Sequence, residues 1–210
     1  MSDAKHRRAH PLRVRTRVPP RAALGGRSAR TSGVTGDSAM INAQAFPTEG
    51  GCDCRTVRFR METPPLFVHC CHSRWCQRES GASFALNAVI EADRVVNLGG
   101  DPELVQTPSE SGKGQVIARC PKCRIAVWSH YSGAGPLLKF IRVGTLDNPD
   151  LLPPDIHIFT QSKQPWMVIP KDTPSVSAYY DREQYWPPES LARRQAILPL
   201  ITAYQASQKR

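Results

Sequence analysis

The chain has 210 residues, of which 40% are apolar, and this is enough for a globular domain with a buried core. Its formal net charge is +10, but residues 1–40 hold nine basic and two acidic residues, so the rest of the chain carries only +3. No segment reaches the roughly 18 consecutive apolar residues of a membrane span, and the first residues lack the apolar stretch of a secretory signal. We therefore expect neither a membrane protein nor a secreted one, and we place the chain in the cytoplasm.

Residues 1–45 are rich in Arg, Pro, Gly, Ser and Thr and show no helical or strand period, so we expect a disordered basic tail. The same composition is typical of an organellar transit segment or of an arm that contacts nucleic acid, which would place the protein in mitochondria or the nucleus. Met40 allows a third interpretation, in which translation starts there and residues 1–39 are not made.

From Gly50 onward, short β-like runs alternate with turn residues. The clearest run is Thr56 to Met61, where apolar residues alternate with polar ones as in a half-buried strand. Further strands are expected over residues 66–70, 83–90, 115–119, 124–131, 137–143 and 156–160. Many short strands with frequent turns predict a mainly β domain with antiparallel pairing.

Residues 189–205 repeat apolar side chains at near-helical spacing, after Pro187 and Pro188. Proline is tolerated at a helix start, whereas Pro199 is expected to kink or end the first segment. We therefore expect a short helix in a C-terminal extension, residues 171–210, packed on a domain of residues 46–170.

Two close cysteine pairs predict a structural zinc site. Cys52 and Cys54 follow a Gly-Gly step, and Cys120 and Cys123 lie between two expected strands. Zinc in structural sites takes four soft ligands in a tetrahedron, and each short pair supplies two. In a reducing compartment, seven cysteines in clusters suit metal binding better than disulfides. The alternative is four buried free cysteines that act as small apolar residues.

A second cysteine cluster occupies residues 69–81 and reads His-Cys-Cys-His-Ser-Arg-Trp-Cys-Gln-Arg-Glu-Ser-Gly. Cys71 and Cys76 could share a metal ion, with Cys70 or a neighbouring histidine as third ligand, or they could supply a thiolate nucleophile. Adjacent residues on a strand face opposite ways, so Cys70 is expected in the core.

Four motifs together resemble the glutathione-dependent formaldehyde-activating enzyme family, which shares its domain with centromere protein V. They are Gly-Gly-Cys-x-Cys at 50–54, Cys-His-x-x-x-Cys-x-Arg-x-Ser-Gly at 71–81, Cys-Pro-x-Cys at 120–123 and Val-Gly-Thr-Leu-Asp at 143–147. The resemblance covers about residues 47–170 and implies a β-tent fold. It also implies a structural zinc on Cys52, Cys54, Cys120 and Cys123.

The resemblance further implies a second zinc on a Cys-His-Cys-x-x-Cys motif, where glutathione and formaldehyde form an S-hydroxymethyl adduct. The outer cysteines of that motif match Cys71 and Cys76, but the middle one matches Ser73. Catalytic zinc usually has three protein ligands, and a serine hydroxyl is a poor substitute for a thiolate. Three outcomes follow: water or His72 completes a weak metal site, Cys71 and Cys76 act as a metal-free thiol pair, or the site is degenerate.

Two further groups of side chains could serve a substrate site. Four arginines could bind the carboxylates of a glutathione-like peptide, or could simply carry surface charge. These are Arg58, Arg60, Arg74 and Arg78. Four aromatic or imidazole side chains could line a pocket near the metals, or could pack in the core and at its rim. These are His130, Tyr131, His157 and Trp166.

The leading functional hypothesis is a zinc-dependent carbon–sulfur lyase that acts on the adduct of a glutathione-like thiol and a small aldehyde, with Cys71, Ser73 and Cys76 at the reacting centre. The alternative is a non-catalytic, zinc-stabilised binding module whose basic tail contacts nucleic acid. No feature of the sequence indicates an oligomeric state.

Overall fold

The computed structural model describes residues 43–208, so the interpretations of the basic tail lie almost entirely outside the described residues. Within residues 43–208, no helix combines the length and the apolar character needed to cross a membrane.

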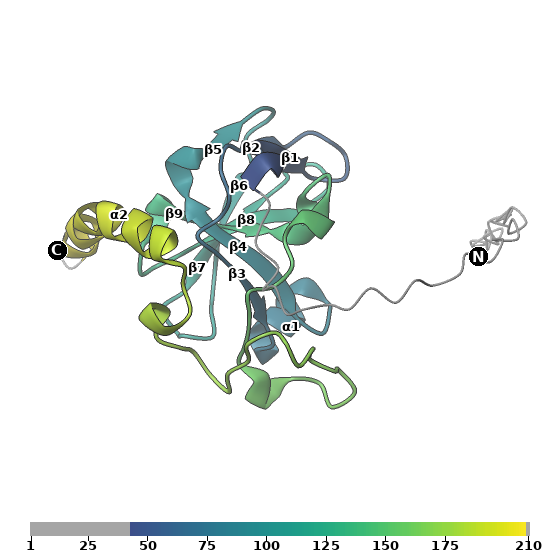
Figure 1. Cartoon of the computed structure of the whole chain (residues 1–210). Helices are drawn as coiled ribbons and strands as arrows, with labels where there is room; N and C mark the ends of the chain where they lie inside the picture. Colours follow the sequence, from purple (N-terminus) through teal and green to yellow (C-terminus); the bar gives the residue numbers. More distant parts are fainter. Residues whose placement is uncertain (1–42, 209–210) are drawn as a thin grey trace, which may run out of the picture. The chain divides into compact units, whose positions relative to one another are not determined.

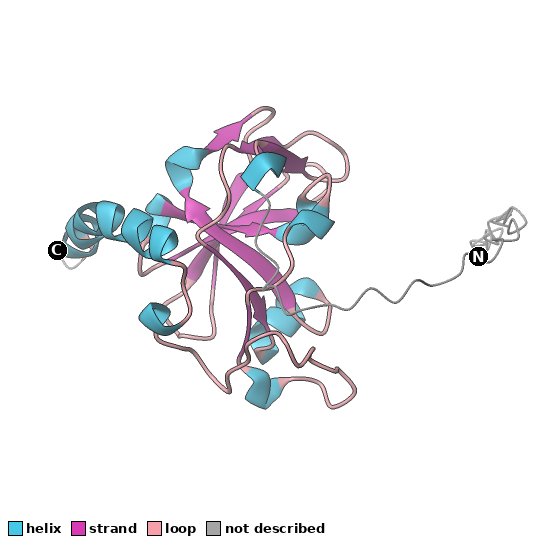
Figure 2. Ribbon diagram, viewed as in Figure 1, coloured by secondary structure: helices cyan, strands magenta, loops and turns pink. Residues whose placement is uncertain are grey.

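Two β-sheets form the body of the described chain (Figures 1 and 2). The small sheet has the order β1-β2-β5, with β1 at Thr48–Gly51, β2 at Arg58–Met61 and β5 at Val95–Asn97. The large sheet has seven strands in the order β10-β3-β4-β9-β8-β7-β6. Its strands are β3 Phe67–Cys71, β4 Ala85–Glu91, β6 Glu103–Thr107, β7 Gln115–Arg119, β8 Ala126–Tyr131, β9 Leu138–Arg142 and β10 Ile156–Ile158. The pairing is antiparallel except between β10 and β3.

Two α-helices accompany the sheets, α1 at Arg74–Ser80 and α2 at Pro188–Ser207. In Figure 1, β1, β2 and β5 gather at the top of the view and α1 lies near the bottom. Single 3-10 turns occur at Ala43–Ala45, Ala92–Arg94, Gly135–Leu137, Val143–Thr145, Pro149–Leu151, Thr160–Ser162 and Arg182–Gln184.

The two faces of the large sheet cover two separate apolar clusters. Side chains of successive strand residues point to opposite faces, so Val68 of β3 joins one cluster and Phe67 joins the other. The first cluster includes the small-sheet residues Phe59 and Met61. The second includes Trp186 and Ile201 from the C-terminal segment. The small sheet therefore covers one face, and the C-terminal segment covers part of the other.

The structure confirms a mainly β domain with a C-terminal helix. Val57, Phe59 and Met61 are fully buried, as their alternation predicted. Three strands that were not expected are β1, β5 and β6, and helix α1 was not expected either. These elements are short, and the edge strand β6 is mostly exposed, so they carry little periodic apolar pattern.

The predictions of a short helix and of a helix end at Pro199 were wrong, because α2 runs for 20 residues with Pro199 inside it. A proline in a helix interior removes one main-chain hydrogen bond. Ile197 and Ile201 on either side of Pro199 both pack into the second cluster. Their burial favours a continuous helix, because tertiary packing supplies most of a helix's stability in a protein.

Candidate functional site

Four cysteines from two distant segments meet beside the first apolar cluster. The sulfurs of Cys52, Cys54, Cys120 and Cys123 all lie within 4.8 Å of one another. Cys52 Sγ lies 3.5 Å from Cys54 Sγ. Cys54 Sγ lies 3.6 Å from Cys120 Sγ, although the two residues are 66 positions apart in the sequence. None of these cysteines forms a disulfide.

Each cysteine pair lies in a tight turn of the same kind. The N–H of Cys52 donates to the carbonyl of Val57, and the N–H of Cys120 donates to the carbonyl of Ile125. An arginine with positive φ follows each pair, Arg55 at 60° and Arg124 at 66°. The left-handed backbone at these two arginines turns the chain back and leaves main-chain N–H groups facing the sulfurs.

Main-chain N–H groups around this cluster stabilise thiolates. The N–H of Val57 lies 3.3 Å from Cys52 Sγ, and those of Lys122 and Cys123 lie 3.4 and 3.5 Å from Cys120 Sγ. Burial opposes ionisation of Cys120, yet the N–H groups of Cys123 and Lys122 lower its pKa. The contact with Thr56 lowers the pKa of Cys54 to about 6. Burial raises the pKa of Cys52 to about 11, so this thiol needs a cation beside it to ionise at neutral pH.

The donor set fits zinc. Four sulfurs held tetrahedrally at about 2.3 Å from a zinc ion lie about 3.8 Å from one another. The two sulfur–sulfur distances of 3.5 and 3.6 Å come close to that spacing. Four cysteine sulfurs without a free position are typical of a structural site.

The second cysteine cluster lies on the other face of the large sheet. Cys71 ends β3, and Cys76 lies in α1. Both belong to the second apolar cluster, whereas Cys52 and Cys120 belong to the first. Ser73 is the N-cap of α1, and its hydroxyl oxygen accepts a hydrogen bond of 3.2 Å from the N–H of Cys76. The hydroxyl is therefore engaged in holding the helix that carries Cys76.

Cys71 and Cys76 act as one titrating pair. A hydrogen bond from the Cys71 thiol, with help from Ser73, lowers the pKa of Cys76 to about 7 although burial opposes this. The same contact and burial raise the pKa of Cys71. Above about pH 7 the pair therefore shares one proton, with Cys76 as the thiolate and Cys71 as the thiol.

A cavity of about 550 Å³ opens beside these two thiols. Cys71, Ser73, Cys76 and the predicted Tyr131 line it. Cavities of this size hold small organic ligands, and a mostly apolar wall with a few polar groups is usual for them. The structure thus brings the three residues predicted for the reacting centre to one cavity wall.

On the opposite face of β3, Cys70, His72 and His157 form a buried group. His72 Nε2 lies 2.9 Å from His157 Nδ1 and 3.6 Å from Cys70 Sγ. Two nitrogens on one tetrahedral zinc lie about 3.4 Å apart, so the shorter distance indicates a hydrogen-bonded imidazole pair. Burial lowers the pKa of His72 to about 4 and lowers that of His157 too, so both imidazoles are neutral at pH 7.

This group corrects one expectation. His72 cannot complete a metal site with Cys71 and Cys76, because its side chain contacts Cys70 and His157 on the other face of the sheet. Sequence reasoning placed Cys70 in the core, where it is buried, but missed its association with the two histidines. The parallel pairing of His157 with Cys70 joins them, and no local motif signals that pairing.

The four predicted arginines lie outside the cavity. Arg58 pairs with Asp147 and Glu49, and Arg60 pairs with Glu62. Arg74 and Arg78 line a shallow hollow that also includes the exposed Trp166. His130 is bound to the carbonyl of Leu138 at 2.8 Å. The cations that do line the cavity are Lys113, Arg182 and Arg194, which sequence reasoning did not single out.

Comparison with known proteins identifies a family whose matched region contains both cysteine clusters. The sequence model of the family described as glutathione-dependent formaldehyde-activating enzyme matches residues 47–162, which include both cysteine clusters. The chain belongs to this family. It is also similar to a protein of Halomonas elongata named "Putative glutathione-dependent formaldehyde-activating enzyme", with 27% identity over 126 residues, 58% of this chain and 80% of the relative.

Among solved structures, the chain is similar to a crystal structure of a Rhodobacter sphaeroides protein at 17% identity and a TM-score of 0.36. The similarity covers 49% of this chain and 92% of that one. Membership of the formaldehyde-activating enzyme family rests on the sequence match over residues 47–162.

Proposed function

We propose that this protein is a carbon–sulfur lyase that acts on the adduct of a thiol and a small aldehyde, such as S-hydroxymethylglutathione. The observation that carries the proposal is the pair of thiols, Cys71 and Cys76, on the wall of a cavity large enough for a peptide-like thiol. Family membership supports the substrate class and a β-tent description of the fold. Seven free cysteines support a reducing compartment such as the cytoplasm.

We assign Cys52, Cys54, Cys120 and Cys123 to one structural zinc ion, because their geometry and chemistry fit it. The second cluster does not fit a zinc ion in the same way. It offers two thiols, and the Ser73 hydroxyl is bonded to the main chain of α1. Three protein ligands are usual even in open catalytic sites, so the proposed chemistry uses the thiols alone.

In this proposal the Cys76 thiolate is the general base. It takes the proton of the adduct's hydroxyl group while the carbon–oxygen double bond forms and the carbon–sulfur bond breaks. The electron pair of that bond leaves with the thiol sulfur, and the neutral Cys71 thiol donates a hydrogen bond to it. The reverse sequence forms the adduct from thiolate and aldehyde.

The test follows the exchange between free glutathione, formaldehyde and their adduct by nuclear magnetic resonance, with the purified full chain present. We expect faster exchange than in buffer, with a rate that rises with pH through about 7 as Cys76 ionises. Cys76→Ser should lower the catalysed rate by about 100-fold, since general bases contribute roughly that much or more. A folded protein that leaves the exchange at the buffer rate would overturn the proposal.

The alternative of a nucleic-acid-binding module depends on the basic tail. That tail lies outside the described residues, and the structure offers no observation that favours the alternative.

A further inference from the structure

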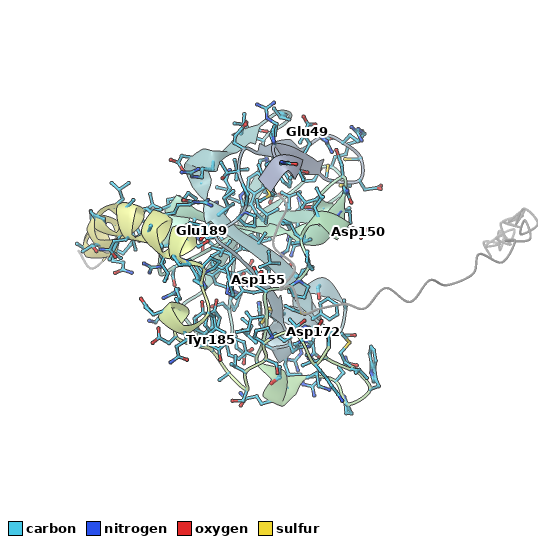
Figure 3. All side chains as sticks on the ribbon, in the orientation of Figure 1. Glu49, Asp150, Asp155, Asp172, Tyr185 and Glu189 are labelled. Carbon is cyan, nitrogen blue, oxygen red and sulfur yellow. The ribbon has the colours of Figure 1, made fainter. Side chains whose placement is uncertain are left out.

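The C-terminal segment supplies part of the cavity wall. The family match ends at residue 162, but the chain then continues through a 3-10 turn at Arg182–Gln184 into α2. Figure 3 labels Tyr185 and Glu189, which flank the entry to that helix. Six residues beyond the family match line the cavity: Tyr179, Arg182, Trp186, Arg194, Ile201 and Gln205. The cavity is therefore shaped by residues that the family's own sequence model does not include.

Two of these residues are arginines that form no ion pair within the described chain, although the charge of Glu183 acts on Arg194 and that of Arg182 acts on Asp181. Within the described residues, ion pairs involve Arg58, Arg60, Arg94, Arg119, Arg124 and Arg193, but neither Arg182 nor Arg194. The neighbouring Arg193 shows the contrast, because it pairs with the buried Glu91 at 2.5 Å. Half-buried guanidinium groups usually have hydrogen-bond acceptors. Because Arg182 and Arg194 form no ion pair with another described residue, they leave hydrogen-bond donors free on the cavity wall.

Aromatic rings hold Arg182 in place. Its guanidinium lies 5.8 Å from the ring centre of Tyr179 and 5.9 Å from that of Trp186. Burial lowers the pKa of Arg194 and the positive charge of Arg182 lowers it further, while the negative charge of Glu183 offsets part of this effect. The two cations are thus close enough to repel each other, and a shared anion would relieve that repulsion.

The rest of the cavity wall is also suited to an anionic ligand. Its charged residues are Lys113, Arg182 and Arg194 against a single acid, Glu110. The Trp75 side chain lines the cavity, and its Nε1–H is buried without a hydrogen-bond partner. The arginine pair lines the same cavity as the thiols of Cys71 and Cys76.

We propose that Arg182 and Arg194 form a carboxylate-binding subsite that holds the non-reacting, acidic end of a thiol substrate while its sulfur reaches Cys71 and Cys76. The placement of the substrate sulfur in this inference rests on the proposed function, whereas the binding of the carboxylate does not. Planar guanidinium groups bind carboxylates through two parallel hydrogen bonds, which fixes orientation as well as charge. The substrate class is therefore a thiol adduct with at least one free carboxylate, as in a γ-glutamyl peptide.

The test measures binding and not turnover. S-methylglutathione keeps the carboxylates but cannot react, and its dimethyl ester has the same shape without the negative charges. We expect the full chain to bind the acid about 100-fold more tightly than the diester by calorimetry, since two charge-assisted contacts are lost. Arg182→Gln and Arg194→Gln should each weaken binding of the acid about tenfold and leave binding of the diester unchanged.

Arg78→Gln is the matched control, because it removes the same charge from an exposed residue outside this cavity. It should bind both probes as the unaltered chain does. Arg194→Lys keeps the charge but not the planar fork, so it should recover part of the affinity. Thermal unfolding of each variant shows that its fold is retained.

Equal affinity for acid and diester in the unaltered chain would overturn the subsite. So would unchanged binding of the acid by the folded double variant Arg182→Gln, Arg194→Gln. Failure of the proposed lyase gives a different result, in which the acid still binds in preference to the diester but no exchange of the adduct is catalysed.

Discussion

The two cysteine groups lie on opposite faces of one sheet and differ in what surrounds the sulfurs. In the first group, four sulfurs face one another within 4.8 Å, and main-chain N–H groups point at two of them. In the second, two thiols line an open cavity, and the position between them is held by a serine hydroxyl that caps a helix. A closed set of four ligands suits a permanent metal, whereas a pair of thiols beside a cavity suits exchange with a ligand.

The difference also extends to the residue that lies between Cys71 and Cys76. Ser73 has its own structural task, because its hydroxyl satisfies the Cys76 N–H at the start of α1. A thiol is a weak hydrogen-bond acceptor, so this position cannot serve equally well as a helix cap and as a metal ligand. Substitutions at the two groups therefore have different expected effects.

The largest effect is expected from Cys120→Ala in the four-cysteine group. The zinc ion joins segments that are 66 positions apart, and structural zinc contributes directly to the free energy of folding. We expect the variant to lose its metal and most of the roughly 5–15 kcal/mol by which a domain of this kind is stable. Metal content per chain and urea unfolding measure both quantities, and a chelator should act on the unaltered protein in the same way.

Cys70→Ala is the control for that variant, because Cys70 is equally buried but belongs to the hydrogen-bonded histidine group. It should retain about one zinc per chain, with a loss of stability of only about 1–2 kcal/mol from the small cavity it creates. If Cys70→Ala lowered the metal content as Cys120→Ala does, this result would contradict the assignment of the zinc ion to the four-cysteine group alone.

A smaller but more specific effect is expected from Ser73→Cys. A third thiol completes the usual ligand number of an open zinc site, so the metal content should rise from about one to about two ions per chain. With only the four-cysteine site filled, the variant should be less stable than the unaltered chain by about 1 kcal/mol, because cysteine caps the helix poorly. An unchanged metal content would show that residue 73 is not placed to join Cys71 and Cys76 in binding an ion.

Much of the site could be predicted from the sequence because short motifs report local geometry. The spacing within each cysteine pair predicts a tight turn. The alternation of apolar and polar residues around Phe59 predicts which face of the strand is buried. The two close pairs also predicted that Cys52 and Cys120 share one zinc site, and the family resemblance supplied a fold that joins them.

Other features could not be predicted, because they depend on contacts between segments far apart in the chain. The parallel pairing of β10 with β3 brings His157 to Cys70 without any local signal. Arg182 and Arg194 reach the cavity only because the segment after residue 162 folds back over the sheet. The continuity of α2 through Pro199 likewise depends on the burial of Ile197 and Ile201. The helix propensities of single residues do not take such burial into account.

The smallest effect tests the capping function of Ser73 alone. Ser73→Ala removes the acceptor of the Cys76 N–H and should lower the free energy of unfolding by about 1 kcal/mol, as is usual for a lost N-cap. Ser73→Thr keeps the hydroxyl that accepts the hydrogen bond, so stability should be nearly unchanged. Neither variant should change the metal content, since neither adds or removes a thiol. Equal stability of the alanine and threonine variants would show that the hydroxyl does not hold α1, and helix capping would then no longer explain why a serine stands between Cys71 and Cys76.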